Sequence, residues 1–257
     1  MPISLSLVTY NNDLTELNTL MDSVKKLTIE YSMYVIDNSP SKDLESFFSP
    51  FPNVIYMHTG KNVGFGAGHN IALKEVLKKD FTYHLFVNPD VYFEEGEIEK
   101  LVSYISKDEK IAMLGPKINW PNGKTQHNCR RLPRPWDIFV RRFIPRKWGK
   151  RRLEYYEMQD KDYNNPIEAG FVSDSCVLYR MKCLEEVGLY EEKFFLYYEE
   201  MDMALRLQQL GYKVIYYPDA KITHGRRSEH RINLKIFFIS LKATFIYFNK
   251  HGWFPLS

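Results

Sequence analysis

Cysteine is scarce in this sequence, and the few cysteines form no recognisable motif. The chain of 257 residues has three, Cys129, Cys176 and Cys183, and none belongs to a C-x-x-C pair. An odd number of widely spaced cysteines argues against a disulfide framework, and the missing pairs argue against a zinc cluster. We therefore expect reduced thiols in a cytoplasmic protein.

Long apolar segments are also missing. The first residues lack the basic region followed by an apolar region that marks a secretory signal. Apolar stretches such as Ile236–Leu241 are far shorter than the ~20 residues that a membrane-spanning helix needs. Internal repeats and low-complexity tracts are absent as well. These absences predict a chain that is neither exported nor membrane-spanning.

Core-forming residues are present in ordinary amounts. Hydrophobic residues make up 44% of the chain and aromatic residues 15%. A chain of this length and composition can bury a full core, so disorder is not expected. We predict one large domain over residues 1–257.

Strand-like and helix-like patterns alternate through the first 115 residues. Strands are expected at Ile3–Thr9, Met33–Ile36, Val54–Met57, His84–Val87 and Ile111–Leu114, and helices after the N-cap Asp13, at Ala67–Lys79 and at Glu95–Ile105. Strands that alternate with helices predict an α/β fold with a mostly parallel sheet and helices on both faces.

The second half of the chain is less regular. Residues 119–166 are rich in proline, tryptophan and cations and are too long for a simple connection, which indicates a functional insertion. Further elements are expected at Phe171–Arg180 (β), Met181–Val187 (α), Glu199–Leu210 (α), Val214–Tyr217 (β) and Ile232–Asn249 (α). The last helix is amphipathic, with Phe237, Phe238, Leu241, Phe245 and Phe248 expected on one side. Packing on its own domain is favoured over membrane contact.

The net charge is only +3, but cations gather in one segment. Ten cations stand between residues 130 and 152 against one acid, Asp137. They are Arg130, Arg131, Arg134, Arg141, Arg142, Arg146, Lys147, Lys150, Arg151 and Arg152. Aromatic residues such as Trp136 and Trp148 lie among them, a composition typical of surfaces that bind anionic lipid headgroups. A solvated basic loop is an equally good interpretation.

Polar side chains follow three of the predicted strands. They are Thr9, Tyr10 and Asn11 after the first strand, Asp37 and Asn38 after the second, and Asn88 and Asp90 after the fourth. Ligands of parallel α/β sheets bind outside the C-terminal ends of the strands. We therefore expect these side chains to meet in one crevice.

The loop Asn62–Asn70 has three glycines, Gly64, Gly66 and Gly68, where a helix is expected to begin. Glycine lets backbone N–H groups approach a ligand closely, and a helix N-terminus favours anions, so a nucleotide would fit here. The G-x-G-x-G spacing after the third strand is not the dinucleotide fingerprint, which belongs to the first strand–helix turn. An ordinary tight turn is the alternative.

Two groups of carboxylates have the chemistry of a reaction site. Asp90 is a hard oxygen ligand suited to Mg²⁺ or Mn²⁺, although an isolated Asn-Pro-Asp turn is explained as well by turn stabilisation. Glu199, Glu200 and Asp202 begin a helix after the aromatic run Phe194–Tyr198. The helix dipole favours acids there, and Asp202 with Arg206 has the spacing of a surface pair. A carboxylate that emerges from a partly buried turn can also accept a proton from a substrate hydroxyl.

In this order the motifs resemble the family 2 glycosyltransferases of the GT-A fold, in particular the rhamnosyltransferase-like branch of bacterial O-antigen and capsule synthesis. The family's V-T-Y-N, V-x-D-N, N-x-G-F-x-x-G-x-N, D-x-D-type and F-x-Y-x-E-D-x-D-x-x-x-R motifs correspond to residues 8–11, 35–38, 62–70, 88–90 and 195–206. The resemblance implies a nucleotide-sugar half over about residues 1–115, an acceptor half over about 116–225 and a helical extension over about 226–257.

The resemblance also implies residue roles. The donor would be bound by Thr9, Tyr10, Asn11, Asp37, Asn38, Asn62, Gly64, Gly68, Asn70 and Asn88. The acceptor would be bound by Ser173, Asp174, Glu199 and Asp202. Glu200 would be the catalytic base, and Asp90 a metal ligand. His224 stands where some relatives complete the metal site, although a lone histidine after a strand is equally often a polar loop residue.

Two positions depart from the family pattern. Glu200 stands where the family usually has Asp, so its carboxylate reaches one methylene further. Asp174 stands where relatives usually have a small residue, and a carboxylate there would alter the acceptor pocket.

The resemblance predicts a metal-dependent inverting glycosyltransferase of the hexosyltransferase type. It would use Mn²⁺ or Mg²⁺ to move a sugar such as rhamnose from a dTDP- or UDP-linked donor to a lipid-linked saccharide, in peripheral contact with the inner face of the bacterial membrane. A nucleotidyltransferase is the alternative enzyme, although its glycine-rich loop is expected beside the first strand. A sugar-nucleotide-binding module without turnover is the alternative outside enzymes. Nucleic acid is not an expected partner, because the acidic cluster opposes it.

Overall fold

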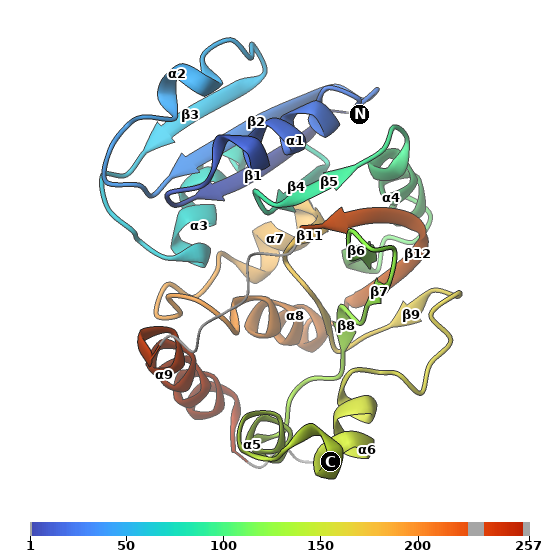
Figure 1. The fold of residues 1–257 in the computed structure, drawn as a ribbon. Helices are drawn as coiled ribbons and strands as arrows, with labels where there is room; N and C mark the ends of the chain where they lie inside the picture. Colours follow the sequence, from blue (N-terminus) through green and yellow to red (C-terminus); the bar gives the residue numbers. More distant parts are fainter. Residues whose placement is uncertain (1, 226–233, 254–257) are drawn as a thin grey trace.

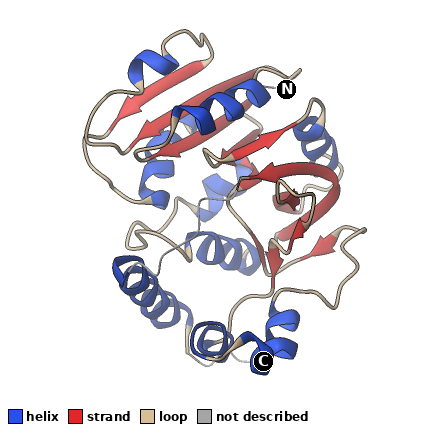
Figure 2. Ribbon diagram, viewed as in Figure 1, coloured by secondary structure: helices blue, strands red, loops and turns tan. Residues whose placement is uncertain are grey.

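A mixed β-sheet runs through the part of the chain that the computed structural model describes, residues 2–225 and 234–253 (Figures 1 and 2). Its first four strands are β3 (Val54–His58), β2 (Tyr31–Asp37), β1 (Ile3–Thr9) and β4 (Tyr83–Val87), and neighbours in this group are parallel. The sheet continues through β11 (Cys176–Arg180), β6 (Ile111–Asn119), β12 (Lys213–His224) and β5 (Val91–Phe93). The predicted α/β class is confirmed.

Strand direction changes at β11, which is antiparallel to both β4 and β6. The reversal is fixed where β4 ends, because the Asn88 N–H donates to the Ser175 carbonyl oxygen at 2.8 Å and Cys176 pairs with Val87. The sheet is therefore parallel in its first half, as predicted, and mixed beyond β4. The start of β11 lies beside the end of β4, so Asp174 and Ser175 reach the edge of the sheet where Asn88 and Asp90 lie.

Each face of the sheet is covered by helices, and the period of two along the strands decides which residues face which helix. Leu5 and Leu7 of β1 pack in one hydrophobic cluster with α1 (Leu14–Val24) and α4 (Glu97–Ile105). Tyr34 of β2 and Phe86 of β4 pack in a second cluster with α3 (Phe65–Val76), α7 (Met181–Val187) and α8 (Glu199–Gln209). A short helix α2 (Glu45–Phe48) precedes β3.

The insertion predicted over residues 119–166 contains more structure than its composition indicates. It holds the short strands β7 (Thr125–Gln126) and β8 (Cys129–Arg130) and the helices α5 (Pro135–Phe143) and α6 (Arg146–Tyr156). β8 pairs with β10 (Phe171–Val172), and β9 (Ile167–Glu168) pairs with β12. A start signal for α5 was present in the sequence: Pro135 is its first residue, and the Asp137 carboxylate accepts the Arg134 N–H at 2.8 Å.

The C-terminal helix α9 (Leu234–His251) packs on its own domain, and the first two residues predicted for it, 232 and 233, lie outside the described residues. Its buried residues are Ala243, Thr244, Tyr247 and Phe248. The face predicted from the aromatic pattern is therefore wrong in part, because Phe238 and Phe245 are exposed. Within residues 2–225 and 234–253, no helix combines the length and apolar character needed to cross a bilayer.

Helix α9 is attached to α8 by a buried charge network centred on Asp202, whose side chain is 0% exposed. Its Oδ2 accepts from Arg206 Nε at 2.9 Å, and its Oδ1 lies 2.7 Å from both Lys250 Nζ and His251 Nε2. The predicted surface pair of Asp202 and Arg206 is thus a buried pair. Burial raises the pKa of Asp202, but the hydrogen bonds from His251 and Lys250 and the charge of Arg206 outweigh it, so the net shift is downward.

We predict that Asp202→Asn lowers the free energy of unfolding by about 3 kcal/mol, because it removes the buried charge to which the partly buried Arg206 and Lys250 are paired. The carboxylate contributes stability above its unfolded-state pKa, and this contribution is lost as the pH falls through the lower folded-state pKa. Urea unfolding at neutral pH measures the effect. Asp22→Asn, which removes an exposed partner of Lys25, is the control and should change stability little. Equal effects of the two variants would contradict the network's role.

Candidate functional site

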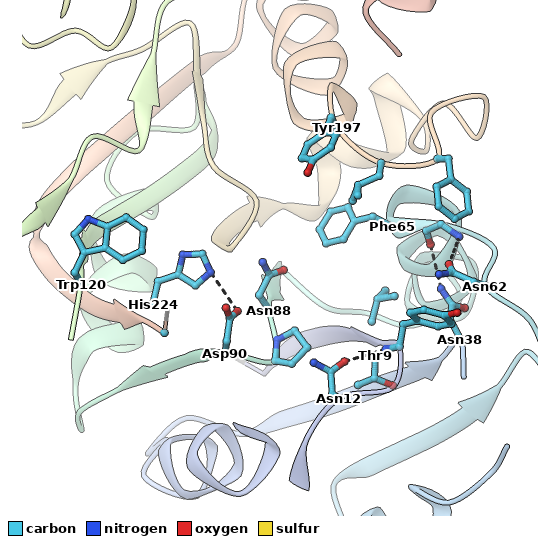
Figure 3. Close-up of a pocket in the computed structure, with 17 residues that line it drawn as sticks. Thr9, Asn12, Asn38, Asn62, Phe65, Asn88, Asp90, Trp120, Tyr197 and His224 are labelled. Atoms are coloured by element: carbon cyan, nitrogen blue, oxygen red, sulfur yellow. Dashed lines mark hydrogen bonds and ion pairs between the residues drawn. The ribbon is translucent and has the colours of Figure 1, made fainter. Parts of the chain in front are cut away.

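The ends of β1, β2, β4 and β12 surround a cavity of about 690 Å³, which we call the strand-end cavity (Figure 3). Its lining residues include Thr9, Tyr10, Asn12, Asn38, Asn62, Gly64, Phe65, Asn88, Asp90, Trp120, Phe195, Leu196, Tyr197 and His224. The predicted crevice at the strand ends therefore exists. Eight of the residues predicted for the donor and metal lie in it: Thr9, Tyr10, Asn38, Asn62, Gly64, Asn88, Asp90 and His224.

Four of the predicted donor residues do not line this cavity. Asp37 is fully buried and accepts hydrogen bonds from Thr9 Oγ1 at 3.1 Å and Tyr56 Oη at 2.6 Å. Asn70 is buried and bonds to the backbone of Tyr190 through both its oxygen and its nitrogen. Gly68 packs against the Val8 side chain of β1, and Asn11 donates its N–H to Ser39 Oγ at 2.9 Å. These residues support the residues beside the cavity, and their direct contact with a donor stays a prediction.

The glycines of the loop Asn62–Asn70 permit close packing within the protein. A Cβ on Gly64 would lie 2.6 Å from the Phe195 carbonyl oxygen, and one on Gly68 would lie 2.9 Å from Val8. The loop N–H groups are also used internally, since Gly64 N–H donates to Asn62 Oδ1 at 3.0 Å and Phe65 N–H donates to the Phe195 oxygen at 3.0 Å. The loop therefore joins the strand-end cavity to the segment before α8.

Asp90 and His224 meet although 134 residues separate them. The pairing of β5 with β12 places His224 opposite Val91, and the Gly225 N–H donates to the Asp90 carbonyl oxygen at 2.6 Å. As a result His224 Nε2 lies 3.1 Å from Asp90 Oδ1, with the two side chains facing each other in Figure 3. The other ring nitrogen, Nδ1, lies 3.5 Å from Gln126 Oε1, and the Trp120 ring stacks on the imidazole with 8° between the planes.

This pair could hold a divalent cation. Two ligands at about 2.1 Å from an octahedral ion and at right angles to each other are about 3 Å apart, which matches the separation of the Asp90 and His224 atoms. Within the described ranges no group of three or more His, Cys, Asp and Glu residues gathers as a metal site. Further ligands would therefore come from substrate phosphates and water, which is how Mg²⁺ usually binds.

A second cavity, of about 620 Å³, adjoins the first, and we call it the carboxylate cavity. Its lining includes Asp174, Glu199 and Glu200, together with Ser173 and Arg130, Arg141 and Arg142. The two cavities share four lining residues: Phe65, Asn88, Leu196 and Tyr197. Asp90 and Glu200 thus belong to adjoining cavities. We call the four residues that line both cavities the shared wall. Asp202, predicted to contact the acceptor, lies outside this cavity in the network that holds α9.

Backbone strain marks the segment that forms the shared wall. Tyr197 and Tyr198 both have positive φ values, 75° and 76°. Residues other than glycine rarely adopt this conformation, which costs of order 1–3 kcal/mol per residue and concentrates at functional sites. The turn brings the chain from the aromatic run into α8, so that Glu199 and Glu200 are its first residues.

Burial dominates the ionisation of the three carboxyls. It raises the pKa of Asp174, and the neighbouring Glu200 charge raises it further, although Tyr190 and Tyr179 donate hydrogen bonds to it at 2.7 and 3.2 Å. Burial, then Glu200, also raises the pKa of Glu199, whose Oε1 has no hydrogen-bond partner among the described residues. Burial raises the pKa of Glu200 as well, opposed by a backbone hydrogen bond and by Arg130 and Arg141.

Several lining residues were not predicted. Phe65, Trp120 and Phe195 supply aromatic surface to the strand-end cavity, and Arg130, Arg141 and Arg142 enter the carboxylate cavity from the insertion. The cation-rich segment was visible in the sequence. Which of its arginines face inward depends on helix α5, and that helix was not predicted.

Comparison with known proteins assigns a family to this arrangement. Residues 4–188 match the model of the family described as "Glycosyl transferase family 2". This match spans β1 to α7 and ends before Glu200. Curated relatives include an N-acetylglucosaminyl-diphospho-decaprenol L-rhamnosyltransferase of Mycobacterium tuberculosis, 26% identical over 79% of this chain and 70% of the relative. The rhamnosyltransferase WbbL of Escherichia coli is 24% identical over 89% of this chain and 86% of the relative.

Solved structures share the fold. A crystal structure of GalNAc-T7 with UDP, GalNAc and Mn²⁺ superposes with a TM-score of 0.68 at 20% identity, over 88% of this chain and 43% of that one. Staphylococcus aureus TarS (residues 1–349) gives a TM-score of 0.57 at 17% identity, over 88% of this chain and 60% of that one. This chain thus spans less than two thirds of these two structures. With the family match covering most of its length, the chain belongs to glycosyl transferase family 2 and has the GT-A fold.

Proposed function

We propose that this protein transfers a hexosyl residue, with rhamnosyl as the first choice, from a nucleoside diphosphate to a hydroxyl of a lipid-linked saccharide, with inversion at the anomeric carbon. The observation that carries the proposal is the adjacency of the two cavities. Asp90 and His224 lie in one, Glu200 lies in the other, and Asn88 and Tyr197 line both. A donor and an acceptor bound in the two cavities would meet at the shared wall.

The strand-end cavity suits the nucleotide sugar if a metal ion balances the charge of the diphosphate. None of its described lining residues is Lys or Arg. Asp90 and His224 would hold Mn²⁺ or Mg²⁺ there, at the ligand separation already described. When bound, the cation would stabilise the negative charge that develops on the leaving diphosphate. The Asn38 and Asn88 amides and Thr9 are placed to orient the nucleotide.

The carboxylate cavity supplies the base. Burial raises the pKa of Glu200 above its ordinary value, which suits a general base, while Arg130 and Arg141 favour its ionised form. Glu200 would accept the hydroxyl proton as the acceptor oxygen forms its bond to C1. The bond from C1 to the diphosphate oxygen breaks in the same displacement, and its electron pair leaves with the nucleoside diphosphate. Attack from the face opposite the leaving group inverts C1.

The relatives support the choice of sugar and acceptor. Those whose names specify a sugar include several rhamnosyltransferases of O-antigen synthesis, and the mycobacterial relative is named for a diphospho-decaprenol acceptor. A Haloferax volcanii relative is named a hexosyltransferase. We therefore propose a dTDP-linked or UDP-linked donor, and an acceptor on a polyprenyl carrier at the inner face of the membrane.

Exposed apolar side chains, most of them aromatic, support contact with that membrane. They are Trp136, Phe139 and Phe143 on α5, Trp148 and Tyr155 on α6, and Leu234, Phe238 and Phe245 on α9. These three helices lie at one end of the molecule in Figure 1, and Arg142 of α5 hydrogen-bonds Ser240 of α9. Trp148 is 75% exposed, and the cations Lys147 and Arg151 lie on the same helix, α6. Exposed aromatics among cations fit an anionic lipid surface.

Product analysis separates the proposal from its alternatives. Purified protein with Mn²⁺, a nucleotide sugar and a lipid-linked acceptor should release nucleoside diphosphate only when the acceptor is present. A nucleotidyltransferase would release pyrophosphate, and a binding module would release neither product.

We predict that Glu200→Gln lowers kcat by roughly 10²–10⁴ while donor affinity is retained, because only the proton acceptor is removed. Wild-type kcat/KM should rise with pH through the pKa of Glu200, which burial raises above its ordinary value. The kcat/KM of Glu200→Gln should not show this rise with pH. Glu200→Asp, the shorter carboxylate, is the control and should retain more activity than Gln. If Glu200→Gln kept the kcat of the wild type, Glu200 would not be the catalytic base.

Asp90→Ala should weaken nucleoside diphosphate binding at least tenfold in Mn²⁺, because the cation loses its carboxylate ligand. Calorimetric titration with dTDP and UDP, with Mn²⁺ and with EDTA, measures the change. In EDTA the variant and the wild type should bind alike. Glu94→Ala, which removes an exposed carboxylate just after β5, is the matched control and should bind like the wild type. Unchanged Mn²⁺-dependent binding by Asp90→Ala would exclude the metal role.

The triple variant Phe139→Ser, Phe143→Ser, Trp148→Ser should reduce binding to anionic vesicles roughly tenfold or more, because it removes apolar area that would enter the lipid interface. Co-sedimentation with vesicles of phosphatidylglycerol and phosphatidylcholine measures it. Leu14→Ser with Leu210→Ser removes side chains of similar exposure on other elements and is the control. If both variants sedimented with the vesicles as the wild type does, the segment 130–152 would be a solvated basic loop instead.

A further inference from the structure

Four of the ten cations of the segment 130–152 form ion pairs. Arg131, Arg146, Lys150 and Arg152 form ion pairs with Asp160, Glu157, Glu154 and Asp137. Arg130, Arg141 and Arg142 have no ion pair among the described residues, and these are the three that line the carboxylate cavity. Arg134, Lys147 and Arg151 also have no ion pair among the described residues and lie outside this cavity, so three of the six unpaired cations are gathered at it.

Packing holds two of these guanidinium groups in place. Arg142 donates to Ser240 Oγ of α9, and its guanidinium lies over the Phe237 ring at 5.3 Å. The Arg130 guanidinium lies 6.0 Å from the centre of the Phe171 ring. Arg130 Nε and Arg142 Nη1 are buried and have no hydrogen-bond acceptor within the described part of the chain. Buried donors without acceptors are costly, and small side-chain rotations toward an anion would satisfy them.

We propose that Arg130, Arg141 and Arg142 form a subsite for the diphosphate that joins the acceptor sugar to its lipid. The inference rests on the proposed function, since it assigns the acceptor to the carboxylate cavity. Guanidinium groups match phosphate oxygens through paired N–H donors and remain charged at any physiological pH. A diphosphate presents enough oxygens to engage all three.

The donor's own diphosphate is a poorer match for these arginines. The donor sits with Asp90 and His224 in the strand-end cavity, and the arginines line only the other cavity. An acidic side and a basic side in one cavity suit a molecule that has a hydroxyl near one end and an anion near the other. Because Glu200 and the arginines share that cavity, the reacting sugar is attached to the diphosphate directly or through a very short saccharide.

The position of α5 explains how the lipid would leave the cavity. Arg141 and Arg142 line the cavity, while Phe139 and Phe143 on the same helix are exposed. Helix α9 repeats the arrangement, with Phe237 and Ser240 at the cavity and Phe238 exposed. A polyprenyl chain that extends from the diphosphate would pass between these helices toward the surface proposed to contact the membrane.

The test measures binding of farnesyl diphosphate by calorimetry in EDTA without membranes, so that neither the metal nor a vesicle contributes. Arg141→Gln and Arg142→Gln should each weaken binding roughly ten- to hundredfold, the range expected for a hydrogen bond to a charged group. Arg151→Gln removes the same charge from α6, outside the cavity, and should bind like the wild type. Arg142→Lys should restore only part of the affinity, because it keeps the charge but not the paired donors.

A kinetic arm separates this inference from the proposed function. Two soluble acceptors are compared, an N-acetylglucosaminyl diphosphate farnesyl ester and the farnesyl glycoside of the same sugar. The arginine variants should raise KM for the diphosphate acceptor only, with Mn²⁺-dependent dTDP or UDP binding unchanged. The subsite would be overturned if Arg141→Gln and Arg142→Gln bound farnesyl diphosphate as tightly as the wild type. It would also be overturned if Arg151→Gln lost as much affinity as they do. Arginine-dependent binding without any sugar transfer would instead overturn the proposed function and leave the diphosphate subsite in place.

Discussion

The hydrogen bond from the Phe65 N–H to the Phe195 carbonyl oxygen joins the two halves of the site. It requires a residue without a Cβ at position 64, because that atom would lie 2.6 Å from the same oxygen. The bond fixes the glycine loop against the strained turn at Tyr197 and Tyr198, and residues from both segments line both cavities. The distance between a donor and an acceptor therefore depends on this contact between two backbone segments. A backbone contact of this kind is more rigid than a contact between flexible side chains.

Charge is distributed so that each cavity suits a different anion. The strand-end cavity has a carboxylate and an imidazole and no Lys or Arg among its described lining residues, which suits a diphosphate that arrives with a cation. The carboxylate cavity has three arginines, so an anion bound there needs none. Under the proposed function, this difference would let the enzyme distinguish the diphosphate that leaves from the diphosphate that stays attached to the acceptor.

The sequence predicted the first half of the fold well because its strands are short apolar runs between clear helix and turn signals. The end-of-strand rule then located Thr9, Asn38, Asn88 and Asp90 at one cavity without any knowledge of tertiary contacts. The family resemblance placed Asp202 at the acceptor, and local spacing paired it with Arg206, but neither could reveal Lys250 and His251, which arrive from the end of the chain. Likewise, the inward direction of Arg141 and Arg142 depends on how α5 meets α9, and no local pattern encodes that contact.

The environment of Asp174 explains how two unusual carboxylates can share one cavity. Two buried carboxyls are rarely both ionised, because each charge disfavours the other. Burial and the charge of Glu200 raise the pKa of Asp174. Arg130 and Arg141 act on Glu200 and favour its charged form. Burial and the Glu200 charge thus favour the protonated form of Asp174, against the hydrogen bonds that Tyr179 and Tyr190 donate to it, while Arg130 and Arg141 favour the ionised form that lets Glu200 accept a proton. Different neighbours give the two acids different roles, the pattern by which one site holds both an acid and a base.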